Sequence, residues 1–269
     1  MFLSVVIPAH NEADNLPQLL NEIRTSLACM ESYEVVVVDD GSSDNTPTML
    51  DEIQSEFPQL RIVRHASSCG QSTALMTGVD AATGEIIATL DGDGQNDPAD
   101  IPGMVDLLVQ SRQTEEVRMI AGMRTKRLDS RWRIISSRIA NGVRSRILKD
   151  GTPDSGCGIK VFLRQTFEIL PRFNHMHRFM PSLVVRGGGK VISYPVNHRV
   201  RTHGKSHYDT LRRLVAGIVD LMGVAWLRRR NKVAVVERLD AVYDERTNLN
   251  SIRFDRSAPV HSPVRRAVG

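Results

Sequence analysis

Residues 84–101 read GEIIATLDGDGQNDPADI, and this stretch decides which fold the rest of the chain can adopt. A mostly apolar run, Glu85–Leu90, leads directly into two carboxylates, Asp91 and Asp93, and the carboxamide of Gln95 follows. A short apolar run of this kind is typical of a buried strand. In open α/β sheets ligands bind beyond the carboxyl ends of the strands, so these polar residues mark a candidate ligand site.

Further out in both directions, the same strand pattern alternates with amphipathic runs. The other expected strands of the first half are Phe2–Ile7, Glu34–Val38, Leu60–Val63 and Val117–Ala121. The expected helices are Asp14–Ala28, a helix that begins near Thr46, Ser72–Ala82 and Ile101–Val109. This alternation predicts an α/β fold with a doubly wound, mostly parallel sheet that is flanked by helices on both faces.

The second half of the chain is less regular. It suggests a basic helix over residues 131–148, a turn-rich loop at Asp150–Gly158, an edge strand at Val191–Val200 and a mainly apolar helix at Leu211–Leu227. We expect one main domain at residues 1–206, an amphipathic helix at 207–230 and a polar, mobile tail at 231–269.

The composition fits one sizeable globular core. Of the 269 residues, 41% are hydrophobic and 25% are charged, which disfavours a disordered chain. The net charge of +4 is modest, and the basic residues gather at 124–149 and 199–230. This uneven distribution suits bound phosphate groups and a separate cation site, so we expect no nucleic-acid partner.

The sequence also predicts where the protein works. The N-terminus lacks the pattern of a signal peptide, and no apolar run reaches the roughly 20 residues that span a bilayer. The three cysteines, Cys29, Cys69 and Cys157, have no metal-binding spacing and are expected to be free thiols in a reducing compartment. We therefore expect a cytoplasmic protein, soluble or peripheral to a membrane.

The acidic cluster has the chemistry of a divalent-cation site. If the chain stays extended, alternation places Asp91, Asp93 and Gln95 on one side. Oxygen ligands of this kind suit Mg²⁺ or Mn²⁺ shared with substrate phosphates. The alternative interpretation is an acidic turn with side-chain caps, but the place of the pair at the end of a buried strand favours the metal.

Six sequence segments together resemble a known family. They are SVVIPAHNEADNL, VVVVDDGSSDNT, GQSTALMTG, GEIIATLDGDGQNDPADI, DSGCGIKVF and RTHGKSHY. Their order and spacing resemble the family 2 glycosyltransferases with the GT-A fold, over roughly residues 3–230. Within that family the chain is similar to the polyprenyl-phosphate glycosyltransferases, the group that includes the dolichol-phosphate mannose synthases.

The resemblance implies a donor site for a nucleoside-diphosphate sugar. It assigns nucleotide contacts to Pro8, Ala9, Asn11, Glu12, Asp40, Gln71, Asp91 and Lys205. It assigns the metal that holds the diphosphate, Mg²⁺ or Mn²⁺, to Asp91, Asp93 and Gln95. Two of these assignments have plain structural alternatives, because Asp40 also suits a turn or a helix cap and Gln71 the start of a helix.

The resemblance also implies an acceptor site for a lipid phosphate. It places acceptor-phosphate contacts on Arg124, Arg133, Ser137 and Ser206. Guanidinium groups bind phosphate oxygens in pairs, although a solvated basic helix face would look similar. Arg201 is expected to stabilise the departing diphosphate, and Asp154 to orient a substrate or, with a hydroxyl acceptor, to act as a base.

The helix at Leu211–Leu227 suits a membrane interface, because Trp226 and the arginines that follow it match the headgroup region. A core or dimer helix is the alternative, and the sequence leaves the oligomeric state open. Peripheral attachment to the cytoplasmic face of a membrane is the expected location.

The expected reaction is the transfer of mannose or another hexose from a nucleoside-diphosphate sugar to a polyprenyl (dolichyl or undecaprenyl) phosphate, with inversion. Asp93, Arg201 and Asp154 are the expected catalytic residues. A transferase that acts on a saccharide or other hydroxyl, with Asp154 as base, is one alternative. A sugar nucleotidyltransferase or a non-catalytic nucleotide-sugar-binding module is the alternative from another class.

Overall fold

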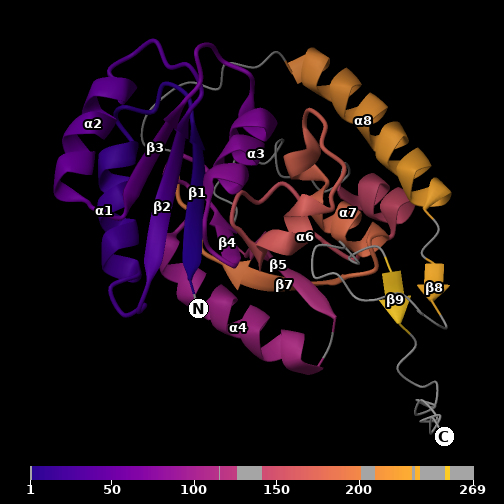
Figure 1. Ribbon diagram of the computed structural model, residues 1–269. Coiled ribbons are helices and arrows are strands. Elements are labelled where there is room, and N and C mark those ends of the chain that lie inside the picture. Colours follow the sequence, from indigo (N-terminus) through magenta and orange to yellow (C-terminus); the bar gives the residue numbers. More distant parts are fainter. Residues whose placement is uncertain are drawn as a thin grey trace, which may run out of the picture. The chain divides into compact units, whose positions relative to one another are not determined.

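A computed structural model describes residues 2–114, 116–125, 141–200, 210–231, 234–236 and 252–254 (Figure 1). Seven strands form one sheet in the order β3-β2-β1-β4-β6-β5-β7. Their bounds are β1 Leu3–Ala9, β2 Tyr33–Asp39, β3 Leu60–Arg64, β4 Ile86–Thr89, β5 Val117–Arg124, β6 Lys160–Leu163 and β7 Lys190–Val196. Strand β6 runs antiparallel to both of its neighbours, and the other pairs are parallel. The predicted doubly wound, mostly parallel sheet is confirmed.

Helices cover both faces of the sheet. Those of the first half are α1 Leu16–Ser26, α2 Thr46–Glu56, α3 Gln71–Ala81 and α4 Ile101–Thr114, with the short 3₁₀ helix η1 at Pro98–Asp100. Those of the second half are residues 141–148, α6 Arg164–Glu168, η2 Met176–Arg178, α7 Met180–Arg186 and α8 Thr210–Arg230. Figure 1 shows α1 and α2 on one side of the sheet and α3, α6 and α7 on the other.

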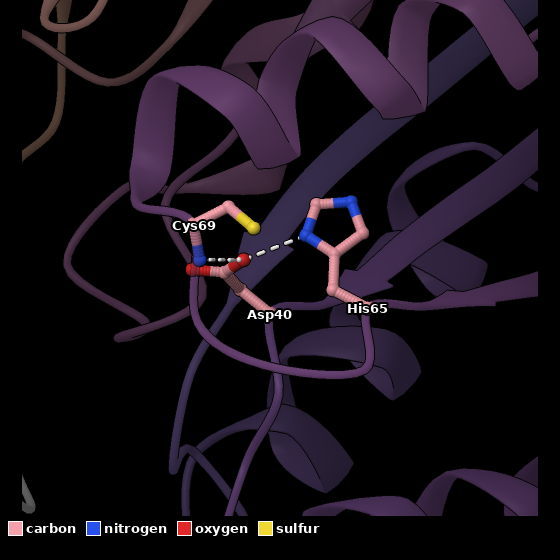
Figure 2. A group of neighbouring side chains, drawn as sticks. All are labelled: Asp40, His65 and Cys69. Carbon is pink, nitrogen blue, oxygen red and sulfur yellow. Dashed lines mark hydrogen bonds and ion pairs between the residues drawn. The ribbon is translucent and has the colours of Figure 1, made fainter.

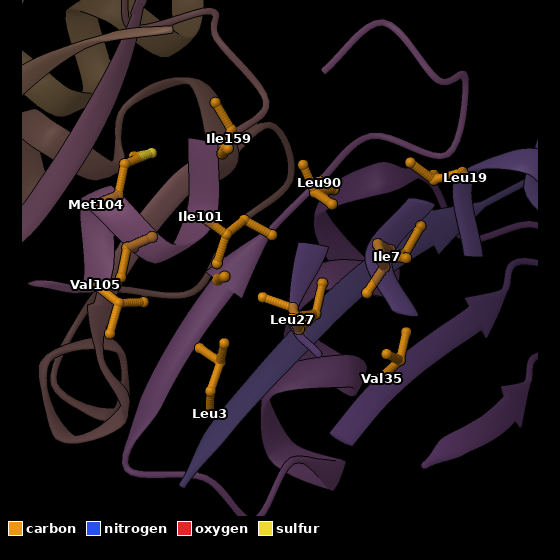
Figure 3. Packing of buried hydrophobic residues seen from close by; sticks show 14 of the residues in the cluster. Leu3, Ile7, Leu19, Leu27, Val35, Leu90, Ile101, Met104, Val105 and Ile159 are labelled. Carbon is orange, nitrogen blue, oxygen red and sulfur yellow. The ribbon is translucent and has the colours of Figure 1, made fainter. Parts of the chain in front are cut away.

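Strand alternation divides the core into two layers. Val5 and Ile7 of β1 point into the layer that holds buried side chains of α1, α2 and α4, part of which is drawn in Figure 3. Val6, between them, points into the opposite layer with α3, α6 and α7. Successive side chains of a strand face opposite ways, and here both directions are apolar, so β1 is buried on both faces.

Helix α3 lies unusually close to the sheet at Gly78. A Cβ added there would overlap Cγ1 of Val6 and would lie 3.0 Å from Cγ2 of Val38. The missing side chain lets the helix backbone approach β1 and β2. This close approach fixes the position of the helix start, where Gln71 faces the ligand site.

Helix α8 is anchored on one face and exposed on the other. Asp220 Oδ2 lies 2.9 Å from His175 Nδ1, Arg186 Nε donates to the carbonyl of Leu227, and Val224 is buried. The outer face exposes the side chains of Val219, Met222 and Trp226, each more than half exposed. Within the described part of the chain, no helix combines the length and apolar character needed to cross a bilayer.

The chain divides into two compact units, Met1–Arg230 and Asn231–Gly269. In the second unit, β8 at Ala234–Val236 pairs in parallel with β9 at Ile252–Phe254. These two strands fall in the segment predicted to be a mobile tail, and the final residues, 255–269, lie outside the described residues.

Candidate functional site

A cavity of about 820 Å³ opens at the carboxyl ends of β1 and β4. Its wall joins residues that are far apart in the sequence: Pro8, Gln71, Leu75, Asp91, Gln95, Arg124, Val143, Arg144, Cys157, Lys160, His177, Phe179, Met180, Ile218 and Leu221 are among them. One part of the wall is charged and the other is apolar, with α8 supplying apolar side chains. Such a cavity can hold a polar substrate beside a hydrophobic one.

Asp91 is a half-buried carboxylate in this wall. Its Oδ1 accepts a hydrogen bond of 2.8 Å from Nε2 of Gln71. Gly158 packs so closely that an added Cβ would overlap the Asp91 carboxylate. Burial, and next the charge of Asp93, raise the pKa of Asp91 to about 6, against the lowering effects of Lys160, Arg124 and Gln71. The prediction that Asp91 and Gln71 share one site is consistent with this geometry.

The chain after Asp91 turns, and the expectation of an extended segment was wrong. Residues 92 and 93 form a turn, and Gly94 has φ of 70°, a conformation that glycine adopts without strain. The turn is closed by the backbone N–H of Gln95, which donates to Asp93 Oδ1 over 3.2 Å. Because the chain turns at these residues, the side chains of Asp91, Asp93 and Gln95 do not follow the alternation of an extended strand.

Despite the turn, the acidic pair fits a divalent cation. The charge of Asp93 lies close enough to Asp91 to raise the pKa of the Asp91 carboxyl, and Gln95 lines the same cavity as Asp91. A cation would relieve the repulsion between two carboxylates that share a site. The chemistry of these residues therefore fits a divalent cation, and the assignment of Asp91, Asp93 and Gln95 as its ligands stays a prediction.

Arg124, which lines the cavity, forms an ion pair with Asp154. Nε of Arg124 donates to Asp154 Oδ2 over 2.7 Å, and its second terminal nitrogen donates to Oδ1 over 2.8 Å. Both side chains are largely buried. The structure therefore gives Arg124 a carboxylate partner where the sequence predicted a phosphate, and it holds Asp154 in a fork where one alternative predicted a base.

The predicted nucleotide residues of β1 meet the loop that follows β2. Pro8 lines the cavity and Ala9 is buried. The Asn11 side chain accepts hydrogen bonds from the backbone N–H groups of Ser43 and Asp44, over 2.8 and 3.3 Å. Glu12 Oε2 accepts from Asn15 over 2.6 Å. Asn11 has φ of 56°, which this residue type tolerates better than most. These contacts hold the two loops together; whether they also bind a nucleotide stays a prediction.

Asp40 is satisfied by a neighbouring loop, as Figure 2 shows in part. Its oxygens accept from Nδ1 of His65 over 2.6 Å, the Ser68 hydroxyl over 2.9 Å, and the backbone N–H groups of Cys69 and Gly70 over 2.9 and 2.8 Å. Burial opposes its charge, but these bonds lower the pKa of the Asp40 carboxyl below its ordinary value.

Asp40, His65 and Cys69 also place potential metal-ligand atoms within 4.8 Å of one another. The carboxylate already accepts four hydrogen bonds, and the second His65 nitrogen lies 3.0 Å from the Thr77 hydroxyl. A metal would have to displace these partners. The hydrogen bonds to Asp40 therefore fix the 65–70 loop at the start of α3. The predicted contact of Asp40 with the nucleotide stays a prediction.

Several predicted site residues cannot be placed. Arg133, Ser137, Arg201, Lys205 and Ser206 lie outside the described residues. The last described residues before 201 run beside the acidic turn, because the Arg199 N–H donates to the Gln95 carbonyl over 2.9 Å. The predicted roles of these five residues remain predictions.

The structure adds three wall residues that sequence reasoning missed. Lys160 is buried at the start of β6, Arg144 is held by Asp150, and His177 lies 2.7 Å from the Ser72 hydroxyl through Nδ1. Lys160 could have been found, because it is a charged residue directly before the apolar run VFL. Arg144 and His177 carry no comparable signal in the sequence.

Comparison with known proteins connects this geometry to one family. The family model described as glycosyl transferase family 2 matches residues 4–170. A dodecaprenyl-phosphate galacturonate synthase of Rhizobium johnstonii is 34% identical over 84% of this chain and 67% of its own length. An undecaprenyl-phosphate 4-deoxy-4-formamido-L-arabinose transferase of Edwardsiella ictaluri is 34% identical over 82% of this chain and 67% of its own length.

Solved structures show the same fold. A mannosyltransferase from Pyrobaculum calidifontis in complex with GDP-Man and Mn²⁺ has a TM-score of 0.63 and 23% identity, over 86% of this chain and 65% of that chain. A glucosyl-3-phosphoglycerate synthase from Mycobacterium tuberculosis, in complex with phosphoglyceric acid, has a TM-score of 0.61 and 18% identity, over 84% of this chain and 79% of that chain. At these identities the likeness shows the fold alone.

Proposed function

Because the chain belongs to glycosyl transferase family 2, we propose that it transfers a sugar from a nucleoside-diphosphate sugar to a polyprenyl phosphate. The observation that carries this proposal is the mixed wall of the cavity, which contains Asp91 together with apolar residues that include Ile218 and Leu221 of α8. A charged sugar donor and a lipid acceptor need both kinds of surface in one place. The names of the two curated relatives support the same acceptor class.

The donor would bind at the carboxyl ends of β1 and β4, with Asp91, Asp93 and Gln95 holding a divalent cation. Such a cation supplies positive charge to the diphosphate as it leaves. An oxygen of the acceptor phosphate attacks the anomeric carbon from the opposite face, the bond from that carbon to the diphosphate breaks, and the configuration inverts. The protein contributes mainly position and complementary charge. Manganese and GDP-Man in one structural neighbour support this arrangement, and Mg²⁺ remains equally compatible with the ligands.

The Arg124–Asp154 pair supports a phosphate acceptor over a hydroxyl acceptor. A hydroxyl must lose a proton to a base, and both Asp154 oxygens already accept from the Arg124 guanidinium. An acceptor phosphate is ionised at neutral pH and needs no base. Asp154 then acts as a positioning group, and the alternative with Asp154 as base loses its main support.

The sugar is proposed from the relatives. Their names indicate galacturonate or 4-deoxy-4-formamido-L-arabinose, whereas the resemblance to dolichol-phosphate mannose synthases indicated mannose. The exposed apolar face of α8 supports a peripheral position at a membrane, where a polyprenyl phosphate resides.

The decisive test incubates the purified protein with undecaprenyl phosphate, Mn²⁺ and labelled nucleotide sugars, one at a time, including the galacturonate, 4-deoxy-4-formamido-L-arabinose, glucose and mannose donors. We expect label in the organic phase with one donor class and none for the Asp93→Asn variant. Release of free sugar without a lipid product, or transfer to saccharides in place of the lipid, would contradict the proposal.

A further inference from the structure

Lys160 is a buried ammonium group in the wall of the cavity. It begins β6 and pairs in register with Thr89 of β4 and Ala121 of β5, and it is 4% exposed. Its Nζ donates to the carbonyl oxygen of Cys157, the one hydrogen-bond partner it has among the residues that the structure describes. An ammonium group has three N–H donors, so burial with a single partner is costly unless nearby charge compensates.

The compensating charges come from the acidic side of the cavity. Asp91 and Asp154 attract the Lys160 ammonium, and Arg124 repels it. Lys160 pairs in register with Thr89, two residues before Asp91, and Lys160 and Asp91 both line the cavity. Among the described residues no ion pair joins Lys160 to a carboxylate, so its charge acts on Asp91 without direct contact. Asp154 already has its own cation in Arg124, at 2.7 Å. The charge of Lys160 therefore acts mainly on Asp91, where it offsets the repulsion from Asp93.

This arrangement places a fixed positive charge beside the ligands of the proposed divalent cation. We propose that Lys160 is a resident counter-ion of Asp91, which weakens divalent-cation binding to the free protein and leaves strong binding to the nucleotide-loaded protein. The inference rests on the proposed function in assigning the cation to Asp91 and Asp93 and a nucleoside diphosphate to the same cavity. It adds a positioning residue and a reason for metal and nucleotide to bind together.

The direction of the effect follows from charge. A diphosphate brings at least two negative charges into the cavity, so it offsets the repulsion between Lys160 and a divalent cation. In its absence that repulsion is uncompensated. At the partly screened distances of a cavity wall, the loss of one positive charge should tighten divalent-cation binding by about tenfold or more.

The experiment measures Mn²⁺ affinity by the electron paramagnetic resonance signal of free Mn²⁺, at about pH 8, where carboxylates are ionised. Wild type, Lys160→Met and the control Lys190→Met are titrated without nucleotide and with UDP or GDP. Lys190 is an exposed lysine at the start of β7. We expect Lys160→Met to bind Mn²⁺ about tenfold tighter than wild type without nucleotide, with a much smaller difference when nucleotide is present. Lys190→Met should match wild type.

Two further variants keep the outcome interpretable. Lys160→Arg retains the charge and should bind Mn²⁺ as wild type does, and Lys160→Gln retains a donor to Cys157 and replaces the Met variant if that one does not fold. Unchanged or weaker Mn²⁺ binding in the neutral variants would overturn the inference. Weaker nucleotide-sugar binding with unchanged Mn²⁺ affinity would instead assign Lys160 to the substrate.

Asp93→Asn separates this inference from the proposed function. Loss of Mn²⁺ binding in that variant supports the assignment of the cation, whatever happens at Lys160. If Asp93→Asn binds Mn²⁺ as wild type does, the metal role in the proposed function fails. If Asp93→Asn loses binding while Lys160→Met changes nothing, the counter-ion inference alone fails.

Discussion

At the scale of single residues, Glu34 of β2 joins three segments of the main unit. Its carboxylate accepts hydrogen bonds from the Ser4 hydroxyl over 2.6 Å, from the backbone and hydroxyl of Thr83 over 2.6 and 2.8 Å, and from Arg61 over 2.7 Å. Burial alone would raise the pKa of Glu34, but these bonds outweigh it and lower the pKa to about 2. The charged form is therefore the one that stabilises the fold.

Glu34→Gln tests this stabilisation. The folded pKa lies below the ordinary value of 4.5, so the contribution is complete above that value and disappears as the pH falls toward 2. At neutral pH we expect the unfolding free energy of the variant to be about 1–2 kcal/mol below that of wild type, allowing for solvent screening of Arg61. As the pH falls, the unfolding free energy of the variant should decrease less than that of wild type, because the variant has no Glu34 carboxylate to protonate. Urea unfolding at several pH values measures this. Parallel pH curves for the two proteins would contradict it.

The raised pKa of Asp91, in contrast to the lowered pKa of Glu34, predicts that Mn²⁺ affinity depends on pH. Its pKa is raised to about 6, so the proton competes with a cation below that pH. Mn²⁺ affinity should be nearly constant above about pH 6.5 and fall by up to tenfold for each pH unit below about 5.5. Asp91→Asn should bind more weakly and show a flatter profile. Equal slopes in both proteins would exclude Asp91 as the titrating group.

Arg124 and Asp154 should behave as one unit. Arg124→Gln or Asp154→Asn removes the two-bond ion pair and leaves the remaining buried charge without a counter-charge. Each single variant should therefore reduce kcat about 10- to 100-fold. The double variant should lose little more than either single one. Kinetics of the three variants measure the coupling, and strictly additive losses would show that the two residues act separately.

At the scale of elements, α3 depends on the contact at Gly78. Gly78→Ala forces a methyl group against Val6 and should cost about 1–3 kcal/mol in thermal or urea unfolding. Gly223 of α8 is the matched control, because an added Cβ there meets nothing within 4 Å. Gly223→Ala should be neutral or stabilise the protein by up to about 1 kcal/mol, since alanine favours the helix. A similar loss in both variants would disprove the packing argument.

The sequence was sufficient for the parallel part of the sheet and insufficient for β6. Strands β1 and β2 are long apolar runs buried on both faces, and such runs stand out between amphipathic helices. Strand β6 has four residues and follows a turn-rich loop, so no periodicity separates it from that loop. Its antiparallel pairing depends on contacts with β4 and β5 that the sequence does not reveal.

The candidate site was predicted to a similar degree. Asp91, Gln71, Arg124 and Pro8, all chosen from sequence segments, line one cavity. The hydrogen-bond partners of Arg124 and Asp40 were not predictable, because Asp154 lies 30 residues from Arg124 and His65 lies 25 residues from Asp40. Such partners depend on how strands and loops meet in space, which local patterns do not specify.

At the scale of the whole molecule, the outer face of α8 predicts membrane binding. Trp226 is 59% exposed and Met222 is 60% exposed, and three arginines follow at the end of the helix. We expect the protein to sediment with vesicles that contain anionic lipid, and Trp226→Ala to weaken this binding about three- to tenfold through lost apolar burial. Val200→Ala, at another exposed apolar residue, is the control. Equal binding of wild type and Trp226→Ala would place the interface elsewhere.

The position of β6 has an evolutionary consequence. The chain leaves the sheet after β5 and returns as β6, its direct neighbour, where Gly122 N–H donates to the Ile159 carbonyl over 3.0 Å. Residues 125–159 therefore connect two strands that are hydrogen-bonded directly to each other. A change in the length of this connection requires no strand to be reordered, so we expect variants with insertions or deletions there to keep the strand order of the sheet.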